Sequence, residues 1–336
     1  MPATVLAAVP FVLASAVILL AGVRLARYGD VIAEKTGLGG TWMGLVVMAA
    51  VTSLPELVTG TSAILVVQVP EVAAGDAIGS CMFNLVILAF LDFRNPKPLS
   101  ATIHQGHVLA AGFGLVQLGL AALGIVAGAR MPVIGWIGLP SLVFLAIYAF
   151  ATRLIFIYER ARLSALAEEL TGDIRYADMT LRYAIGMYVA AAALLVVAAA
   201  YLPAAASNLA AATGLGQSFV GSLFVAAATS MPEVVVSIAA ARLGALDMAA
   251  GNLFGSNLFN IAVLGLDDVL YWRGGLLADI SPVHLVSLIA AMVMTAIAVI
   301  GLTYRAQHKR FRLSWDSIGI VGVYLAAVVL LWRMGG

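Results

Sequence analysis

Two glutamates occupy matched positions inside long apolar segments of the chain. Glu56 belongs to the sequence TSLPE, and Glu233 belongs to the sequence TSMPE, which lies 177 positions further on. A charged side chain near the middle of a membrane span costs about 2.5 to 3.5 kcal/mol on insertion scales, so it is a functional hypothesis by default. We therefore interpret the two carboxylates as the centre of a functional site.

The residues around each glutamate supply further oxygen atoms next to a helix break. Pro55 and Pro232 lack an N–H and clash with the preceding turn, so each is expected to interrupt its helix and free upstream carbonyl groups. Carbonyl oxygens, hydroxyl oxygens and a carboxylate together suit a hard cation. The carbonyls are expected at or near Ala49 and Ala226, and the hydroxyls belong to Thr52, Ser53, Thr229 and Ser230.

A second pair of matched motifs predicts a polar stripe on the helix that follows each break. The stripe comprises Ser80 and Asn84 in GDAIGSCMFN, and Ser256 and Asn260 in GNLFGSNLFN. Residues four apart lie on one face of a helix, and neighbouring glycines let membrane helices approach closely. The two stripes and the two breaks are expected to enclose one central site. Asp76 and Asn252 extend the two stripes by one more turn, and Asp76 is either a third titratable group or a helix-entry residue.

These motifs belong to an internal duplication. Residues 37–63 and 214–240 are identical at 12 of 27 positions, and the segments that begin at Gly75 and Gly251 are identical at 7 of 18. Shared Thr, Ser, Pro, Glu and Asn residues argue against a chance match in an Ala- and Val-rich chain. The sequence predicts a first repeat at 1–157, a linker at 158–180 and a second repeat at 181–336.

The composition excludes a soluble globule. Hydrophobic residues make up 63% of the chain and charged residues 10%, and the mean hydropathy is +1.06, whereas soluble domains average about 25% charged residues. We predict an all-α polytopic membrane protein with ten transmembrane helices. The expected spans are 4–24, 42–69, 72–91, 107–128, 132–155, 183–202, 217–241, 246–266, 282–303 and 315–333.

Basic residues predict the orientation. With the N-terminus outside, the inward loops carry 15 of the 18 Lys and Arg residues, all except Arg130, Arg273 and Arg333. Five spans per half is an odd number, so the second repeat is inverted relative to the first, and both termini lie outside. Inverted five-helix repeats are typical of secondary transporters. The expected location is a prokaryotic inner membrane.

Other polar residues are interpreted as structural. Four matched acids at helix ends and short turns are expected to be solvated, namely Asp92, Asp268, Glu71 and Asp247. The single Cys81 excludes an intramolecular disulfide, and the four histidines lie at predicted span ends. No zinc, haem, redox cofactor or nucleic-acid partner is expected. The partners are inorganic cations and the lipid bilayer, with a monomer compatible with the sequence.

At these motifs the chain resembles the cation/calcium exchanger superfamily, whose repeats carry a GTS-P-E type motif and a GN-xx-GSN-xx-N type motif. The resemblance implies a sodium/calcium-exchanger-like fold with four cation subsites at mid-membrane. It also implies alternating access by sliding of the first and sixth helices over the core.

Residue roles follow from this resemblance by matching position. Glu56 and Glu233 resemble the shared carboxylate ligands of calcium and sodium. The other implied ligands are the hydroxyl or carbonyl groups of Thr52, Thr229, Ser53 and Ser230, the carbonyls of Ala49 and Ala226, the flanking-site residues Ser80 and Ser256, and the central pair Asn84 and Asn260. Asp76 and Cys81 depart from the family pattern. Asparagine at both central positions leaves the counter-ion open.

The favoured function is an antiporter that exchanges calcium, or a similar hard cation, for sodium or protons. Two ionised carboxylates balance one divalent ion, two sodium ions or two protons, so charge arithmetic does not choose between them. One alternative is a proton-coupled or monovalent cation antiporter without specificity for calcium, and another is a cation channel. A membrane enzyme, which would need a nucleophile with a base or a set of metal ligands, is disfavoured because no His or Cys lies near either glutamate motif.

Overall fold

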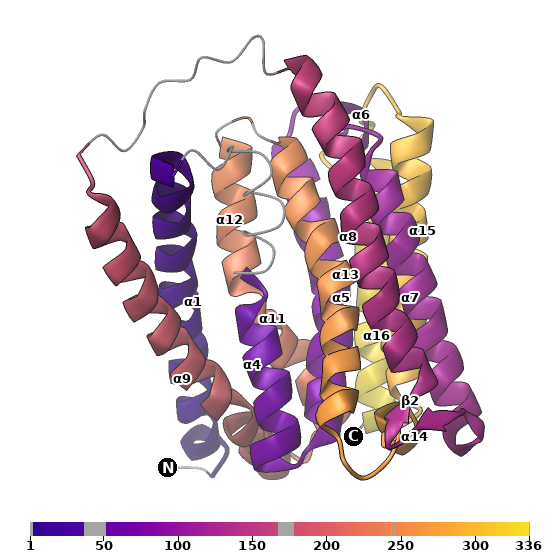
Figure 1. Cartoon of the computed structure of the whole chain (residues 1–336). Helices are drawn as coiled ribbons and strands as arrows, with labels where there is room; N and C mark the ends of the chain where they lie inside the picture. Colours follow the sequence, from indigo (N-terminus) through magenta and orange to yellow (C-terminus); the bar gives the residue numbers. More distant parts are fainter. Residues whose placement is uncertain (1–2, 37–51, 167–177, 243, 245, 336) are drawn as a thin grey trace.

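A computed structural model describes residues 3–36, 52–166, 178–242, 244 and 246–335, and these are almost entirely helical (Figure 1). The first half contains α1 (Ala3–Thr36), α4 (Leu54–Ser62) with the π-helix η2 (Ala63–Val67), α5 (Pro70–Arg94), α6 (Leu99–Thr102), α7 (His107–Ala127), the 3-10 turn η3 (Gly128–Arg130), the hairpin strands β1 (Val133–Ile134) and β2 (Ile137–Gly138), and α8 (Leu139–Leu166). The second half contains α9 (Leu181–Thr213), α10 (Gln217–Val220), the π-helix η4 (Gly221–Val225), α11 (Ala226–Thr229), α12 (Met231–Arg242), α13 (Leu246–Leu270), α14 (Leu276–Asp279), α15 (His284–Tyr304) and α16 (Trp315–Gly335).

Each of the ten predicted spans overlaps an apolar helix, but not all of these helices reach spanning length. Among the described residues, seven helices are long and apolar enough to cross a membrane, or eight if the bent pair Gln217–Thr229 and Met231–Arg242 is one span. The helices at Leu54–Val67 and Leu139–Ile155 are shorter. The segment before Leu54 lies largely outside the described residues, so the count of ten remains a prediction.

The helices form two packed groups. α1 and α9 lie side by side at one edge of the bundle and run in opposite directions (Figure 1). Their buried faces, which include Ile18, Leu25 and Leu202, form one apolar core together with residues of η4 and α11. α5, α7, α13, α15 and α16 share a larger core. The α1 backbone comes close to the second break, since a Cβ atom on Gly22 would lie 2.8 Å from Pro232 Cβ.

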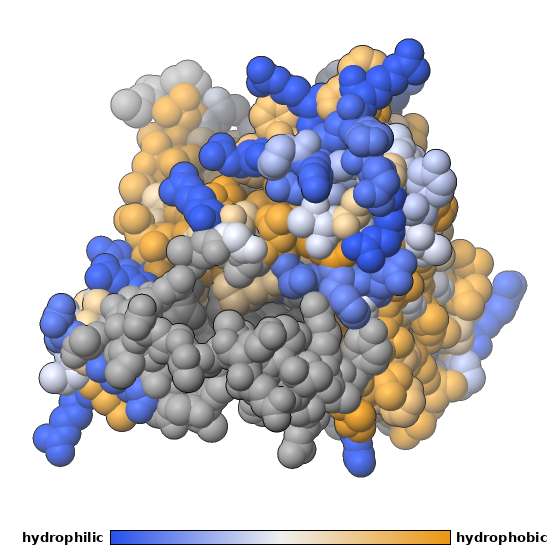
Figure 2. Space-filling view, turned by 90° about the horizontal axis from the view of Figure 1, so that it is seen from above, coloured by the Kyte–Doolittle hydropathy of each residue, from blue (hydrophilic) through white to orange (hydrophobic). Residues whose placement is uncertain are grey.

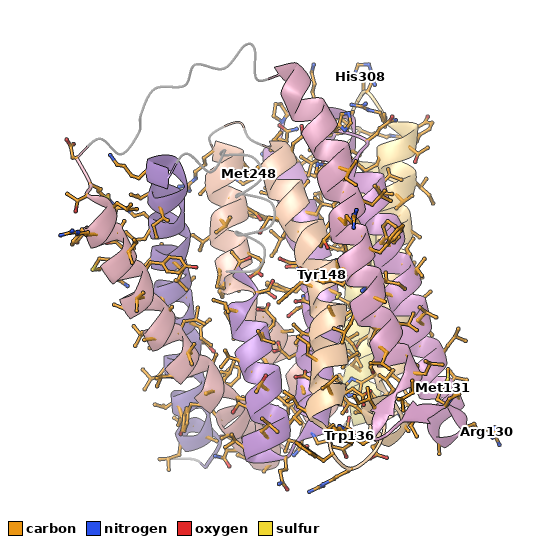
Figure 3. The ribbon with its side chains drawn as sticks, viewed as in Figure 1. Arg130, Met131, Trp136, Tyr148, Met248 and His308 are labelled. Atoms are coloured by element: carbon orange, nitrogen blue, oxygen red, sulfur yellow. The ribbon has the colours of Figure 1, made fainter. Side chains whose placement is uncertain are left out.

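One end of the bundle is polar and its flanks are apolar. Figure 2 looks onto the end where α8 finishes and α9 begins, and shows hydrophilic residues across the described part of that end and hydrophobic residues on its flanks. Both chain termini lie at the opposite end (Figure 1). His308 lies at the first end and Arg130 at the second (Figure 3).

Small residues bring α5 against the π-helix of the second half. A Cβ atom on Gly75 would lie 2.8 Å from the backbone N of Ser222, and one on Gly79 would lie 2.7 Å from Ser222 Cα. Real Cβ atoms do not approach so closely, so only glycine fits at either position. The predicted close helix approach is therefore present at Gly75 and Gly79, although no sequence pattern predicted the π-helix that α5 contacts.

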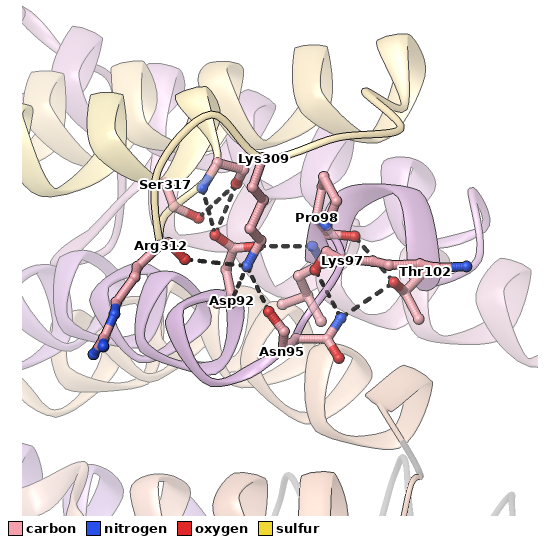
Figure 4. A network of polar contacts seen from close by, with 10 residues as sticks. Asp92, Asn95, Lys97, Pro98, Thr102, Lys309, Arg312 and Ser317 are labelled. Carbon is pink, nitrogen blue, oxygen red and sulfur yellow. Dashed lines mark hydrogen bonds and ion pairs between the residues drawn. The ribbon is translucent and has the colours of Figure 1, made fainter.

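Asp92 and Asp268 were expected to be solvated helix ends, and this is wrong. Asp92 is 1% exposed and accepts hydrogen bonds from the Leu99 N–H at 2.7 Å and the Ser314 N–H at 2.8 Å, and Lys309 Nζ lies 2.9 Å from it (Figure 4). Asp268 is fully buried and accepts from the backbone N–H groups of Gly138 and Leu276. The first N–H groups of α6 and α14 need acceptors, and these carboxylates supply them.

Glu71 and Asp247 were also expected to be solvated, but each contacts a histidine in the other half of the chain. His284 Nε2 lies 2.8 Å from Glu71 Oε2, and His107 Nε2 lies 3.1 Å from Asp247 Oδ1. The first pair connects α15 to α5 and the second connects α7 to α13. Both histidines are buried, so these contacts fix the beginnings of α15 and α7.

Candidate functional site

The first predicted break coincides with the beginning of α4. The helix begins at Leu54, with Pro55 in its first turn, where a missing N–H is tolerated. Ser53 lies just outside the helix, and Glu56 lies in the first turn, where the helix dipole favours negative charge. Ala49 lies outside the described residues, so its carbonyl remains a prediction.

The second predicted break is visible as a bend. The axes of Gln217–Thr229 and Met231–Arg242 differ by 43°, and Ser230 occupies the junction. Glu233 follows in the first turn of α12. The Ala226 carbonyl is not free here, because it accepts hydrogen bonds from the Ser230 N–H at 3.1 Å and the Thr229 hydroxyl at 3.2 Å. Its role as a cation ligand remains a prediction.

Each glutamate is held by a serine from the opposite half. The Ser53 hydroxyl lies 3.0 Å from Glu233 Oε1 and 3.1 Å from Ser256 Oγ. The Ser230 hydroxyl lies 3.0 Å from both Glu56 Oε1 and Ser80 Oγ. The two sets occupy matched positions of the duplication, so they form a pair of Ser–Glu–Ser clusters that cross between the halves.

The threonine that precedes each of these serines also contacts a side chain of the opposite half. The Thr229 hydroxyl donates to Asp76 Oδ1 at 2.8 Å, and the Thr52 hydroxyl lies 3.4 Å from Asn252 Oδ1. Asp76 is 1% exposed and lies in the second turn of α5. It is therefore not a solvated helix-entry residue, and it lies beside the same group of polar side chains as the glutamates.

Amide side chains extend this group between α5 and α13. Asn84 Nδ2 donates to Asn257 Oδ1 at 2.9 Å, and Asn257 Nδ2 donates to the Cys81 carbonyl at 3.2 Å. The Asn260 amide makes no hydrogen bond and is fully buried. We name the whole set the polar cage: Thr52, Ser53, Glu56, Asp76, Ser80, Asn84, Thr229, Ser230, Glu233, Asn252, Ser256, Asn257 and Asn260.

The polar cage is closed to solvent and holds oxygen atoms without partners. Its members are at most 5% exposed. The unpartnered oxygens are Glu56 Oε2, Asp76 Oδ2, Asn84 Oδ1, Glu233 Oε2 and Asn260 Oδ1. Buried polar atoms are normally hydrogen-bonded, so such a set suits a dehydrated cation. Among the described residues, no group of three His, Cys, Asp or Glu side chains is arranged to hold a metal.

Sequence reasoning missed two members of the polar cage as site residues. Asn252 and Asn257 both belong to the GNLFGSN motif of the second half, so the motif itself carried the signal. Cys81, which stands where the second half has Asn257, contributes its carbonyl rather than its thiol to the amide group. The thiol is buried against the carbonyls of Ala77 and Asn257.

The apolar helices and the buried polar cage together define an integral membrane protein with an oxygen-lined site between its halves. The profile of the family described as sodium/calcium exchanger protein matches residues 6–157 and 183–333. The chain therefore belongs to the sodium/calcium exchanger family.

Individual relatives and structures agree with this family. The chain is 32% identical over 120 residues to the sodium/calcium exchanger MaX1 of Methanosarcina acetivorans, a match that covers 35% of this chain and 32% of that protein. It superposes on a structure of the sodium-calcium exchanger NCX_Mj with a TM-score of 0.62 at 21% identity, covering 97% and 99% of the two chains. A structure of the H+/Ca2+ exchanger CAX gives 0.70 at 13% identity, covering 98% and 86%.

Proposed function

We propose that the chain is a secondary antiporter that exchanges calcium for sodium or protons by alternating access. The observation that carries the proposal is the pair of crossed Ser–Glu–Ser clusters, in which each glutamate keeps one buried oxygen unpartnered. An uncompensated buried carboxylate is costly, so each needs a cation or a proton. Family membership adds support, since its described activity is sodium/calcium exchange.

In this mechanism the polar cage replaces the hydration shell of the ion. Glu56 and Glu233 offset the charge, while Ser, Thr and Asn oxygens complete a coordination shell of the six to eight oxygens that calcium takes. Magnesium dehydrates reluctantly and prefers to retain waters, so it fits such a cage less well. Protonation of the two carboxylates would release a bound cation and leave the cage neutral.

Alternating access is supported by the arrangement of the two halves. α1 and α9 run in opposite directions (Figure 1), as two repeats of inverted orientation require. Both lie outside the larger core, and α1 touches the second break at Pro232. Movement of this pair past the core would open the polar cage first to one side and then to the other. A channel would not need a duplicated, closed site, so we favour the antiporter.

The test is ion-driven calcium uptake in proteoliposomes that contain the purified protein. Calcium-45 uptake is measured with an outward sodium gradient, with a pH gradient and with neither. Uptake that requires one of the gradients and saturates with calcium supports the antiporter and identifies the counter-ion. Uptake that proceeds down a calcium gradient with no counter-ion present would identify a channel. Transport of sodium or potassium without calcium would select the monovalent alternative.

A further inference from the structure

Asp267 is a buried acid that lies outside the polar cage and has no role in the proposed exchange. It lies in α13 three residues before the helix ends at Leu270, and it has no exposed surface. Neither carboxylate oxygen makes a hydrogen bond. The matched position in the first half is Leu91, so the duplication does not account for an acid here.

The carboxylate of Asp267 packs directly on the backbone of α4. A Cβ atom on Gly60 would lie 2.8 Å from Asp267 Oδ1 and closer still to Oδ2, so in this position the carboxylate lies directly against the Gly60 backbone. Gly60 follows Glu56 by one helical turn, and Asp267 follows Asn260 by two turns on the same face of α13. Asp267 therefore lies beside the polar cage, toward the end of α13.

That end of α13 lies at the same end of the bundle as the chain termini. The Trp136 indole N–H donates to the Val269 carbonyl at 2.9 Å, and Trp136 lies at the lower end in Figure 3. Both chain termini lie at this end as well (Figure 1). Asp267 is thus placed between the polar cage and one face of the membrane, at a contact between α4 and α13.

No described group compensates a charge on Asp267. The charged groups that act on it are Asp76 of α5 and Asp268 of its own helix, and both are acids. On α4 the Gly60 backbone lies against the carboxylate, and no described Lys, Arg or His forms an ion pair with it. Calcium takes six to eight oxygen ligands, whereas neither carboxylate oxygen of Asp267 has a hydrogen-bond partner among the described residues. The ligand that this environment fits is a single proton.

We propose that Asp267 is a proton-binding site, separate from the polar cage, whose protonated form lets α4 close against α13. When the proton leaves to water, the carboxylate must be hydrated, and the contact with Gly60 opens at the end of the bundle that holds the termini. Because α4 also carries Glu56, the proton on Asp267 controls access to the cage from that side. The control of transport rests on the proposed function, whereas the bound proton does not.

Infrared spectroscopy tests the bound proton without any transport. Purified full-length protein at neutral pH, saturated with calcium, is compared with Asp267→Asn, Asp267→Leu and Asp76→Asn. We expect the C=O band of a protonated carboxylic acid in the wild type and in Asp76→Asn, and its loss in a folded Asp267 variant. Persistence of the whole band in that variant overturns the proposal. Absence of the band from Asp76→Asn also overturns the proposal. This measurement can be made even if neither Asp267 variant folds.

Transport at saturating calcium tests the control of access. In proteoliposomes of determined orientation, the maximal rate in the wild type is expected to change with the pH on the side of the termini. Asp267→Asn should retain exchange and lose this dependence, because its side chain no longer titrates. An unchanged pH dependence of the maximal rate in Asp267→Asn refutes the control of access. If the wild type exchanges no calcium, the proposed function fails and the infrared result still decides whether Asp267 binds a proton.

Discussion

At the scale of single residues, the site depends on pairs that cross between the halves of the chain. Ser53 contacts Glu233, and Ser230 contacts Glu56, in each case at 3.0 Å. A hydrogen bond to a charged group contributes about 1.5–3 kcal/mol, so the serines orient the carboxylates as well as offering oxygens. The two glutamates are therefore expected to be equally necessary, although they belong to different helices.

The first prediction concerns the charge of the two glutamates. Glu56→Gln and Glu233→Gln should each lower calcium exchange by about 100-fold or more, because loss of one partner from a buried charged arrangement costs about 3–5 kcal/mol. The measurement is gradient-driven calcium-45 uptake per folded protein, with monodispersity as the check on folding. Asp316→Asn, which removes a buried acid in α16, is the matched control. Near-normal uptake in either glutamine variant would contradict the proposed site.

A second prediction at this scale concerns protons. Calcium and protons compete for the same two carboxylates, so the apparent calcium affinity should fall as the pH is lowered. Saturating calcium should restore the rate in Asp267→Asn, in which the separate pH dependence of the maximal rate is removed. Calcium-45 uptake at fixed sodium is measured between about pH 5.5 and 8, a range in which buried carboxylates titrate. Asp76→Asn should alter this competition, because Asp76 lies in the same cage. A calcium affinity that stays constant over the range would show that protons do not reach the glutamates.

From the sequence the two glutamates could be proposed as site residues, whereas their contacts could not be predicted. A carboxylate in an apolar run and its duplicated motif identify Glu56 and Glu233, because burial of such a charge has few structural explanations. The crossing of Ser53 to Glu233 depends on how the halves meet, which no local pattern specifies. Asp92 was misjudged because its position at a helix end suggested solvent, while its acceptor atoms bind Leu99 and Ser314.

At the scale of elements, α5 is the helix on which the other half is assembled. It carries Asp76, Ser80 and Asn84 on its polar side, and Gly75 and Gly79 against η4. The π-helix η4 precedes the second break by one short segment, so its close contact with α5 sets where Thr229 and Ser230 lie. Hydropathy predicted these spans, but it did not predict a π-helix, since that depends on tertiary packing.

The third prediction tests this contact. Gly79→Ala should lower the apparent Tm and reduce exchange, because a Cβ atom would lie 2.7 Å from Ser222 Cα and overpacking costs about 1–3 kcal/mol. Gly112→Ala in α7 is the control, since a Cβ atom there meets nothing within 4 Å. Alanine also gains about 1 kcal/mol of helix propensity over glycine, so the control should be neutral or slightly stabilising. Equal Tm values for the two variants would contradict the packing argument.

At the scale of the whole molecule, the chain termini and the end of α8 lie at opposite ends of the bundle (Figure 1). An even number of membrane crossings would place both termini on one side, and the distribution of Lys and Arg predicts that this side is the outside. The membrane fold was predictable because apolar spans occur throughout the chain and matched motifs occur in both of its halves. The helix lengths were not predictable, because α1 and α9 extend well past the predicted spans 4–24 and 183–202.

The fourth prediction is that residues 3 and 335 face the outside of the cell and residue 162 faces the cytoplasm. Single cysteines at these positions are labelled on intact cells with a membrane-impermeant thiol reagent, and again after permeabilisation. The native Cys81 is fully buried, which keeps the background low. We expect labelling of the terminal cysteines in intact cells, and labelling of residue 162 only after permeabilisation. The reverse pattern would invert the topology.

The crossed serine and glutamate pairs also constrain how such a chain can evolve. Ser53 was inherited with Glu56 in one copy of the repeat, yet its contact is with Glu233 in the other. After duplication, the two copies could therefore not diverge independently, because a substitution at position 53 changes the hydrogen bonding of the carboxylate at position 233. Covariation across homologous sequences should couple 53 with 233, and 230 with 56, more strongly than neighbours within either copy. Ser256 of the second repeat also donates to Glu233 at 3.3 Å, but the 3.0 Å contact of each glutamate comes from the other repeat, so selection on these contacts acts on both repeats together.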